Sequence, residues 1–109
     1  MPDYTIKQND TKPNIAVTLK DAADDLVDLT GSTVKLHIRN EARDLVINVA
    51  ATLSGTPTDG TAFWPPTTVL TANVGYYLVE WEVTFPDDSV QTFPNDSEGL
   101  TLEVAAQIE

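Results

Sequence analysis

The sequence contains no cysteine and a single histidine in 109 residues. The absence of cysteine excludes a disulfide framework, a thiolate metal site and a cysteine nucleophile. Stability must therefore come from packing, which a domain of this size can supply without covalent cross-links. No stretch approaches the ~20 consecutive apolar residues that a membrane-spanning helix needs.

Basic residues are also scarce, because six lysines and arginines stand against seventeen aspartates and glutamates, for a net charge of −11. A field of this sign repels nucleic acid and anionic membranes, so we expect neither as a partner. Residues 1–4 have neither the basic nor the apolar region of a secretory signal. We expect a chain that stays in the cytoplasm unless it leaves within an assembly, and acids that lie on solvated strand faces and turns.

The dominant positive pattern is the alternation of apolar and polar residues, which is typical of half-buried strands. The apolar members of the main alternating sets are Ile15, Val17 and Leu19; Val34, Leu36 and Ile38; Ile47, Val49, Ala51 and Leu53; Tyr77, Val79, Trp81, Val83 and Phe85; and Leu100, Leu102 and Val104. Weaker strands are expected at residues 4–8, 61–64 and 90–93. Turn signals recur about every 8–12 residues, which predicts an all-β sandwich of seven to eight antiparallel strands in one domain over residues 1–109.

Three connections carry their own signals. Residues 21–29 contain apolar side chains at spacings that allow a short helix, whereas residues 40–44 indicate a polar hairpin. Pro65 and Pro66 lack the backbone donors of a central strand. We therefore expect the segment after Trp64 to be a loop that crosses from one sheet to the other.

The strongest strand begins with the sequence Gly75-Tyr76-Tyr77. In immunoglobulin-like domains a tyrosine at this corner often bonds back to the backbone just upstream. Tyr77 shares its parity with Trp81, so we expect both rings to face the core, with the Tyr77 hydroxyl at the edge. This pattern favours an immunoglobulin-like β-sandwich.

Lys35, His37 and Arg39 form a basic stripe on the polar face of one predicted strand. Cationic neighbours disfavour a charged imidazole and a metal ion alike, so His37 is interpreted as a surface residue and not as a catalytic base. Glu80 and Glu82 form an acidic stripe on a strand that we expect to be adjacent. A ladder of opposite charges is the favoured interpretation, and a partner-docking patch is the alternative.

Two aromatic residues and one acidic cluster are the other candidates. Trp64 and Tyr76 are candidate partner-docking residues, although the favoured interpretation of Trp64 is a plug at one end of the sandwich. Asp24, Asp25 and Asp28 lack the spacing of a calcium-binding loop. A solvated turn is favoured there over a weak divalent-cation contact, and no cofactor is expected.

A resemblance to a known family emerges from the order of several motifs, none of them specific alone. The motifs are Ile6-Lys7-Gln8-Asn9-Asp10-Thr11, Val27-Asp28-Leu29-Thr30-Gly31-Ser32-Thr33-Val34, Gly75-Tyr76-Tyr77, Glu82-Val83-Thr84-Phe85 and Thr92-Phe93-Pro94-Asn95. Together they resemble the N-terminal domain of phage baseplate upper proteins and related free-standing tail proteins of tailed bacteriophages. The resemblance covers nearly the whole chain.

The resemblance implies an immunoglobulin-like sandwich that docks on the tail or baseplate core, with no catalytic residues. The implied partners are other phage structural proteins, in a homo-oligomer or a multi-copy symmetric assembly, and the implied location is the virion. Baseplate upper proteins continue into a receptor-binding segment, whereas this sequence ends at Glu109, so we expect the module itself to be the component. A head-decoration or head–tail protein is an alternative, as is a carbohydrate- or cell-surface-binding module that uses Trp64 or Tyr76.

Overall fold

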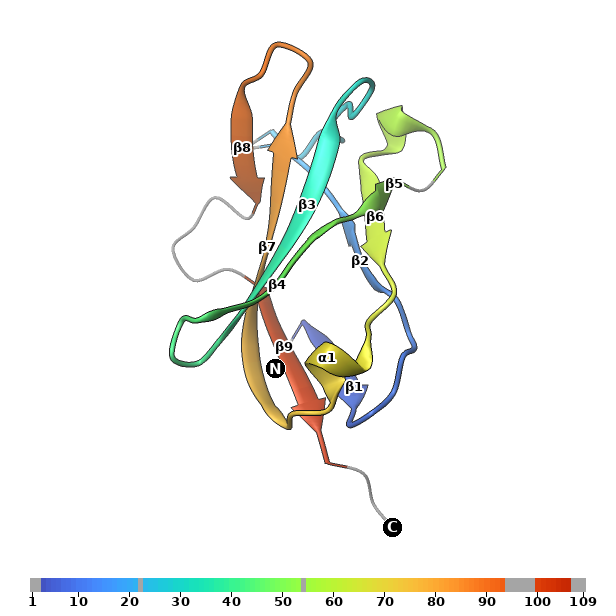
Figure 1. Ribbon diagram of the computed structural model, residues 1–109. Coiled ribbons are helices and arrows are strands. Elements are labelled where there is room, and N and C mark those ends of the chain that lie inside the picture. Colours follow the sequence, from blue (N-terminus) through green and yellow to red (C-terminus); the bar gives the residue numbers. More distant parts are fainter. Residues whose placement is uncertain (1–2, 22, 54, 94–99, 107–109) are drawn as a thin grey trace.

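The computed structural model describes residues 3–21, 23–53, 55–93 and 100–106 (Figure 1). These residues are nearly all in strands and the loops between them. The elements are β1 (Tyr4–Lys7), β2 (Ile15–Thr18), β3 (Thr33–Asn40), β4 (Leu45–Ala50), β5 (Thr52–Leu53), a 3₁₀ turn (Pro57–Asp59), β6 (Thr61–Trp64), α1 (Thr68–Thr71), β7 (Gly75–Thr84), β8 (Val90–Phe93) and β9 (Leu100–Ala105).

The strands form two sheets, an arrangement consistent with a β-sandwich (Figure 1). The larger sheet has the order β1-β9-β7-β3-β4, and the smaller sheet has the order β2-β6-β5. β8 pairs with the second half of β7, whereas β9 pairs with its first half, so that β8 and β9 follow one another along the same side of β7.

Two details of the predicted strand set need correction. The described residues contain nine strands where seven to eight were expected, and β5 has only two residues. β1 runs parallel to β9, so the pairing is mixed and not antiparallel throughout. Alternation along one strand reports which face is buried and carries no information on the direction of the neighbouring strand.

The predicted parity of the long strands is confirmed. β3 and β7 pair along their length, and their inward side chains form the centre of the core. Leu36, Ile38, Val79, Trp81 and Val83 are all 0% exposed. Burial of this apolar surface at roughly 25 cal/mol per Å² is the main force holding the two sheets together.

Two of the predicted connections are present: the hairpin at residues 40–44 and the segment after Trp64 that passes from one sheet to the other. The polar hairpin at residues 40–44 is confirmed, since the Asn40 N–H donates to the Asp44 carbonyl at 3.0 Å and β3 continues into β4. The segment after Trp64 does cross between the sheets, but it also contains the single turn of α1.

The short helix considered at residues 21–29 is absent from the described part of that segment. Instead Lys20 and Leu26 form an isolated antiparallel bridge. The Asp21 carboxylate accepts the backbone N–H groups of Ala23 and Asp25, and so turns the chain back on itself. Side-chain acceptors of this kind compete with helical backbone bonds, which explains the outcome.

The corner at Tyr77 has the predicted geometry. The Tyr77 side chain is 7% exposed, and its hydroxyl donates to the Asn73 carbonyl at 2.7 Å. This bond joins the start of β7 to the segment that follows α1. Because the ring is buried, the pKa of the Tyr77 hydroxyl is raised.

Candidate functional site

The basic stripe lies where the sequence placed it, on the outer face of the larger sheet. Lys35 is opposite Glu82, and His37 is opposite Glu80 in the register of β3 and β7. The cross-strand alignment that the charge ladder requires is therefore present. Yet the ion pair that forms among the described residues joins Lys20 to Asp24 at 3.7 Å, so the ladder is not closed by direct contacts.

Arg39 has a local role in addition to its place in this stripe. Its Nη1 donates to the Arg43 carbonyl at 3.1 Å and so braces the hairpin between β3 and β4. Lys35 is exposed, whereas His37 and Arg39 are half-buried. The stripe is thus a surface of partly compensated charge, with Lys35 as its most accessible cation.

The two aromatic docking candidates, Trp64 and Tyr76, differ in exposure to solvent. Trp64 is only 9% exposed and belongs to the core, so its interpretation as an exposed anchor is wrong. Trp64 is the last residue of β6, and its burial agrees with the favoured interpretation of a core residue. Tyr76 is 54% exposed, since it has the opposite parity to Tyr77 on β7, and it remains a surface residue available to a partner.

The acidic cluster lies in turns of the chain. Asp24 pairs with Lys20, and the Asp28 carboxylate accepts both the hydroxyl and the backbone N–H of Thr30. Those two hydrogen bonds lower the pKa of Asp28 below 3.8. No group of three acidic or histidine side chains is positioned to hold a metal ion within the described ranges.

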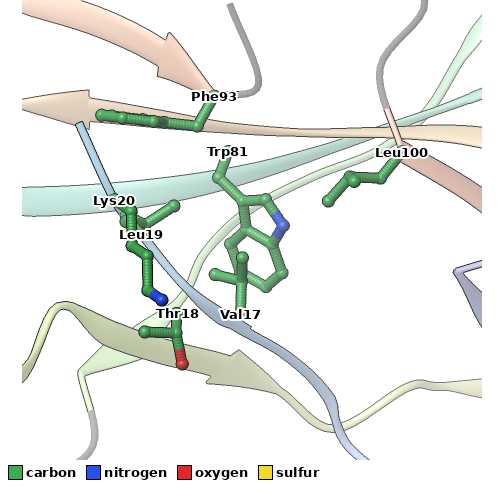
Figure 2. Close-up of a pocket in the computed structure, with 7 residues that line it drawn as sticks. All are labelled: Val17, Thr18, Leu19, Lys20, Trp81, Phe93 and Leu100. Atoms are coloured by element: carbon green, nitrogen blue, oxygen red, sulfur yellow. The ribbon is translucent and has the colours of Figure 1, made fainter. Parts of the chain in front are cut away.

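Sequence reasoning missed a pocket beside Trp81, which lies between residues 17–20, in and just after β2, and residues of β7, β8 and β9 (Figure 2). Its volume is about 240 Å³. The residues that line it are Val17, Thr18, Leu19, Lys20, Trp81, Phe93 and Leu100. Parity identifies the side chains that point between the sheets, but it does not reveal where opposing side chains leave space.

Five of the seven residues that line this pocket are apolar, and the other two are Thr18 and Lys20. Trp81 is fully buried, Phe93 is 6% exposed, and Val17 and Leu100 are half-buried. The indole Nε1 of Trp81 is buried without a hydrogen-bond partner of regular geometry among the described residues. Such a pocket suits an apolar side chain, because burial in it removes hydrocarbon from water.

Tyr4 closes one side of the gap between the sheets. Its hydroxyl donates to the Ala16 carbonyl of β2 at 2.9 Å. Burial raises the pKa of Tyr4, and the nearby indole N–H of Trp81 offsets part of that rise. The ring therefore links β1 of the larger sheet to the edge of the smaller one.

Comparison with models of known protein families and with curated protein sequences finds no match for this chain. Among the described residues, no helix has the length and apolar character that crossing a bilayer requires.

Proposed function

We propose that this chain is a non-enzymatic, immunoglobulin-like docking module of a tailed-bacteriophage virion, in the tail or the baseplate. The observation that carries the fold part of the proposal is the Tyr77–Asn73 hydrogen bond at the start of the long strand β7. A tyrosine that bonds to the backbone a few residues upstream is a hallmark of immunoglobulin-like sandwiches.

The strand orders support the same assignment. A sheet of β2, β6 and β5 beside a sheet ordered β1-β9-β7-β3-β4 follows the immunoglobulin-like division of strands between two sheets. On this assignment β3 and β7 are the central pair of the larger sheet, and Trp81 is their core residue. β8 is an added strand at the end of the β7 hairpin.

The virion part of the proposal is supported by the resemblance of the motifs to baseplate upper proteins. A role in docking also agrees with the sites described. His37 lies between two cations along β3, and Glu80 is opposite it in the register of the sheet. The carbohydrate-binding alternative loses Trp64 to the core and retains only Tyr76.

Immunogold labelling of phage particles tests the proposal. Gold-conjugated antibodies against this chain are applied to purified particles produced from the genome that encodes it, and the particles are imaged by negative stain. We expect localised label at symmetric positions on the tail or baseplate. Label confined to the head would support the head-decoration alternative, and particles without label, in lysates that contain the chain, would refute a virion role.

A further inference from the structure

The outer edge of β2 is an open sheet edge. β2 pairs with β6, and the Leu19 N–H donates to the Gly60 carbonyl at 2.7 Å in the continuation of this pairing. Because backbone groups alternate sides along an antiparallel strand, those of Ala16 and Thr18 point away from β6. No strand of the described residues pairs with them.

Tyr4 uses only part of this edge. Its hydroxyl bonds to the Ala16 carbonyl, and this contact confirms that the Ala16 carbonyl faces outward. The backbone N–H and carbonyl of Thr18 have no hydrogen-bond partner among the described residues. The free portion of the edge is therefore the half that lies beside the pocket, which Val17, Thr18, Leu19 and Lys20 help to line.

We propose that an extended segment of another protein adds to β2 as a further strand and inserts an apolar side chain into the pocket beside Trp81. The inference rests on the proposed docking role and names the surface that performs it. Main-chain bonds to a sheet edge supply affinity in this mode of recognition, and pockets for alternate side chains supply specificity.

The size of the pocket fits this role. An apolar cavity of about 150 Å³ accommodates benzene, so a pocket of about 240 Å³ has room for a side chain of leucine or phenylalanine size. In an added strand, every second side chain would point between the sheets. One such side chain would contact Val17 and Leu100, the half-buried members of the lining.

Charge selects the kind of partner. Asp21, Asp24 and Asp25 lie three to seven residues after the end of β2 and are exposed, and Lys20, the cation of the pocket lining, pairs with Asp24. Asp3 accepts the backbone N–H of Thr101, which is next to Leu100 of the lining. A second copy of the chain would bring another −11 charges to this acidic rim. A segment of a different protein that carries lysines or arginines around its apolar positions is complementary to it.

The opposite edge of the molecule provides a comparison. β4 is also an edge strand, and its register with β3 turns the backbone of Asn48 outward. However, no residue of β4 is among those that line the pocket beside Trp81. Asn48 is therefore a matched control for the role of Thr18.

A synthetic peptide tests the proposal on the full chain. The probe is a strand of about six residues in which valine alternates with threonine and lysines flank both ends. Its control has the same composition with the valines grouped together. In ¹⁵N NMR titrations we expect the alternating peptide to shift the amides of Ala16 and Thr18 and the indole signal of Trp81, which a Trp64→Phe variant identifies. Equal shifts with the control peptide, or shifts confined to β4, would overturn the proposal.

Two variants locate the contact. Thr18→Pro removes an outward donor without removing a bond to β6, and we expect it to weaken binding by about tenfold or more, whereas Asn48→Pro leaves binding unchanged. Val17→Glu keeps every backbone donor and places a carboxylate at the pocket, so we expect the same loss of peptide binding. If Thr18→Pro does not fold, this variant tests the docking site in its place. Wild-type binding by Val17→Glu refutes insertion into the pocket.

Two further results separate this inference from the proposed function. Sedimentation that shows a dimer of the chain, abolished by Thr18→Pro, would identify a second copy as the occupant and overturn the assignment of a different protein. Gold label that persists on particles assembled with Val17→Glu would leave the virion role intact and refute this edge as its docking site. Peptide binding to the wild-type chain, together with particles that carry no label, would support this edge as a docking site and refute the virion role.

Discussion

The hydrogen bond between Tyr77 and Asn73 contributes to the free energy of unfolding, and the substitution Tyr77→Phe measures that contribution. Tyr77→Phe removes the hydroxyl that donates to the Asn73 carbonyl at 2.7 Å and retains the ring of this buried residue. The net value of a hydrogen bond in a protein is about 0.5–1.5 kcal/mol. Asn73 is exposed, so water can solvate its carbonyl in the variant, and we expect a loss of about 1 kcal/mol.

Urea and thermal denaturation measure this loss. In a domain of this size, about 1 kcal/mol corresponds to a decrease in Tm of roughly 4–8 °C. The urea m value should not change, because the same surface is exposed on unfolding. A lower m value would mean that the substitution altered the denatured state or the compactness of the fold.

The neighbouring tyrosine is the control. Tyr76 is 54% exposed, and its hydroxyl makes no hydrogen bond with the described residues. Tyr76→Phe should therefore change the free energy of unfolding by less than about 0.5 kcal/mol. If the two variants lose the same stability, or if Tyr77→Phe melts like the wild type, the corner does not hold β7 as we argue.

Three further variants test other parts of the structure. Trp81→Ala empties the fully buried centre of β7, so urea denaturation should show a loss on the order of 3–5 kcal/mol, and a smaller loss than about 1 kcal/mol would contradict its place in the core. Gly60→Ala should cost more than about 1 kcal/mol in thermal melts, because Gly60 has φ of 69° and an added Cβ would lie 2.9 Å from the Leu19 carbonyl oxygen; an unchanged Tm would refute this. Thr30→Val removes the hydroxyl that lowers the pKa of Asp28, so the carboxyl should titrate closer to 3.8 by NMR, and an unchanged titration would show that the hydroxyl is not the main cause.

The shifted pKa values of Asp28 and Tyr4 predict how the stability of the fold depends on pH. The pKa of Asp28 is lower in the folded chain than its ordinary value of 3.8. A carboxyl of this kind stabilises the fold above pH 3.8, and that stabilisation disappears as the pH falls through the folded pKa. The pKa of Tyr4 is raised instead, so its protonated form favours folding, and stability is lost as the pH rises above 10.0.

Local periodicity was sufficient for most of the strands and for the core. Val79, Trp81 and Val83 were assigned to the interior by parity alone, and all three are fully buried. The corner at Tyr77 was also predictable, because the bond that it makes spans only four residues. Such features depend on the pleat of one strand or on neighbours in the sequence.

The pairing between strands that are distant in the sequence could be predicted only in part. The basic stripe of β3 was placed next to the acidic stripe of β7 through the expected immunoglobulin-like order, and the register opposes Lys35 to Glu82. The parallel pairing of β1 with β9 was not anticipated, since alternation is the same for both directions. The choice depends on where the chain packs after residue 7, which is a property of the whole fold.

The docking edge lay outside prediction for the same reason. The alternation of Ile15, Val17 and Leu19 is the pattern of a central strand as much as of an edge, and β2 is an edge only because β1 pairs with β9 instead. Natural sheet edges are commonly protected by proline, bulges or inward charges. The outward positions Ala16 and Thr18 carry none of these, and Lys20, two residues after Thr18, pairs with Asp24 at 3.7 Å. The four-residue β2, next to an apolar pocket, is therefore the edge at which we propose that a strand of another protein docks.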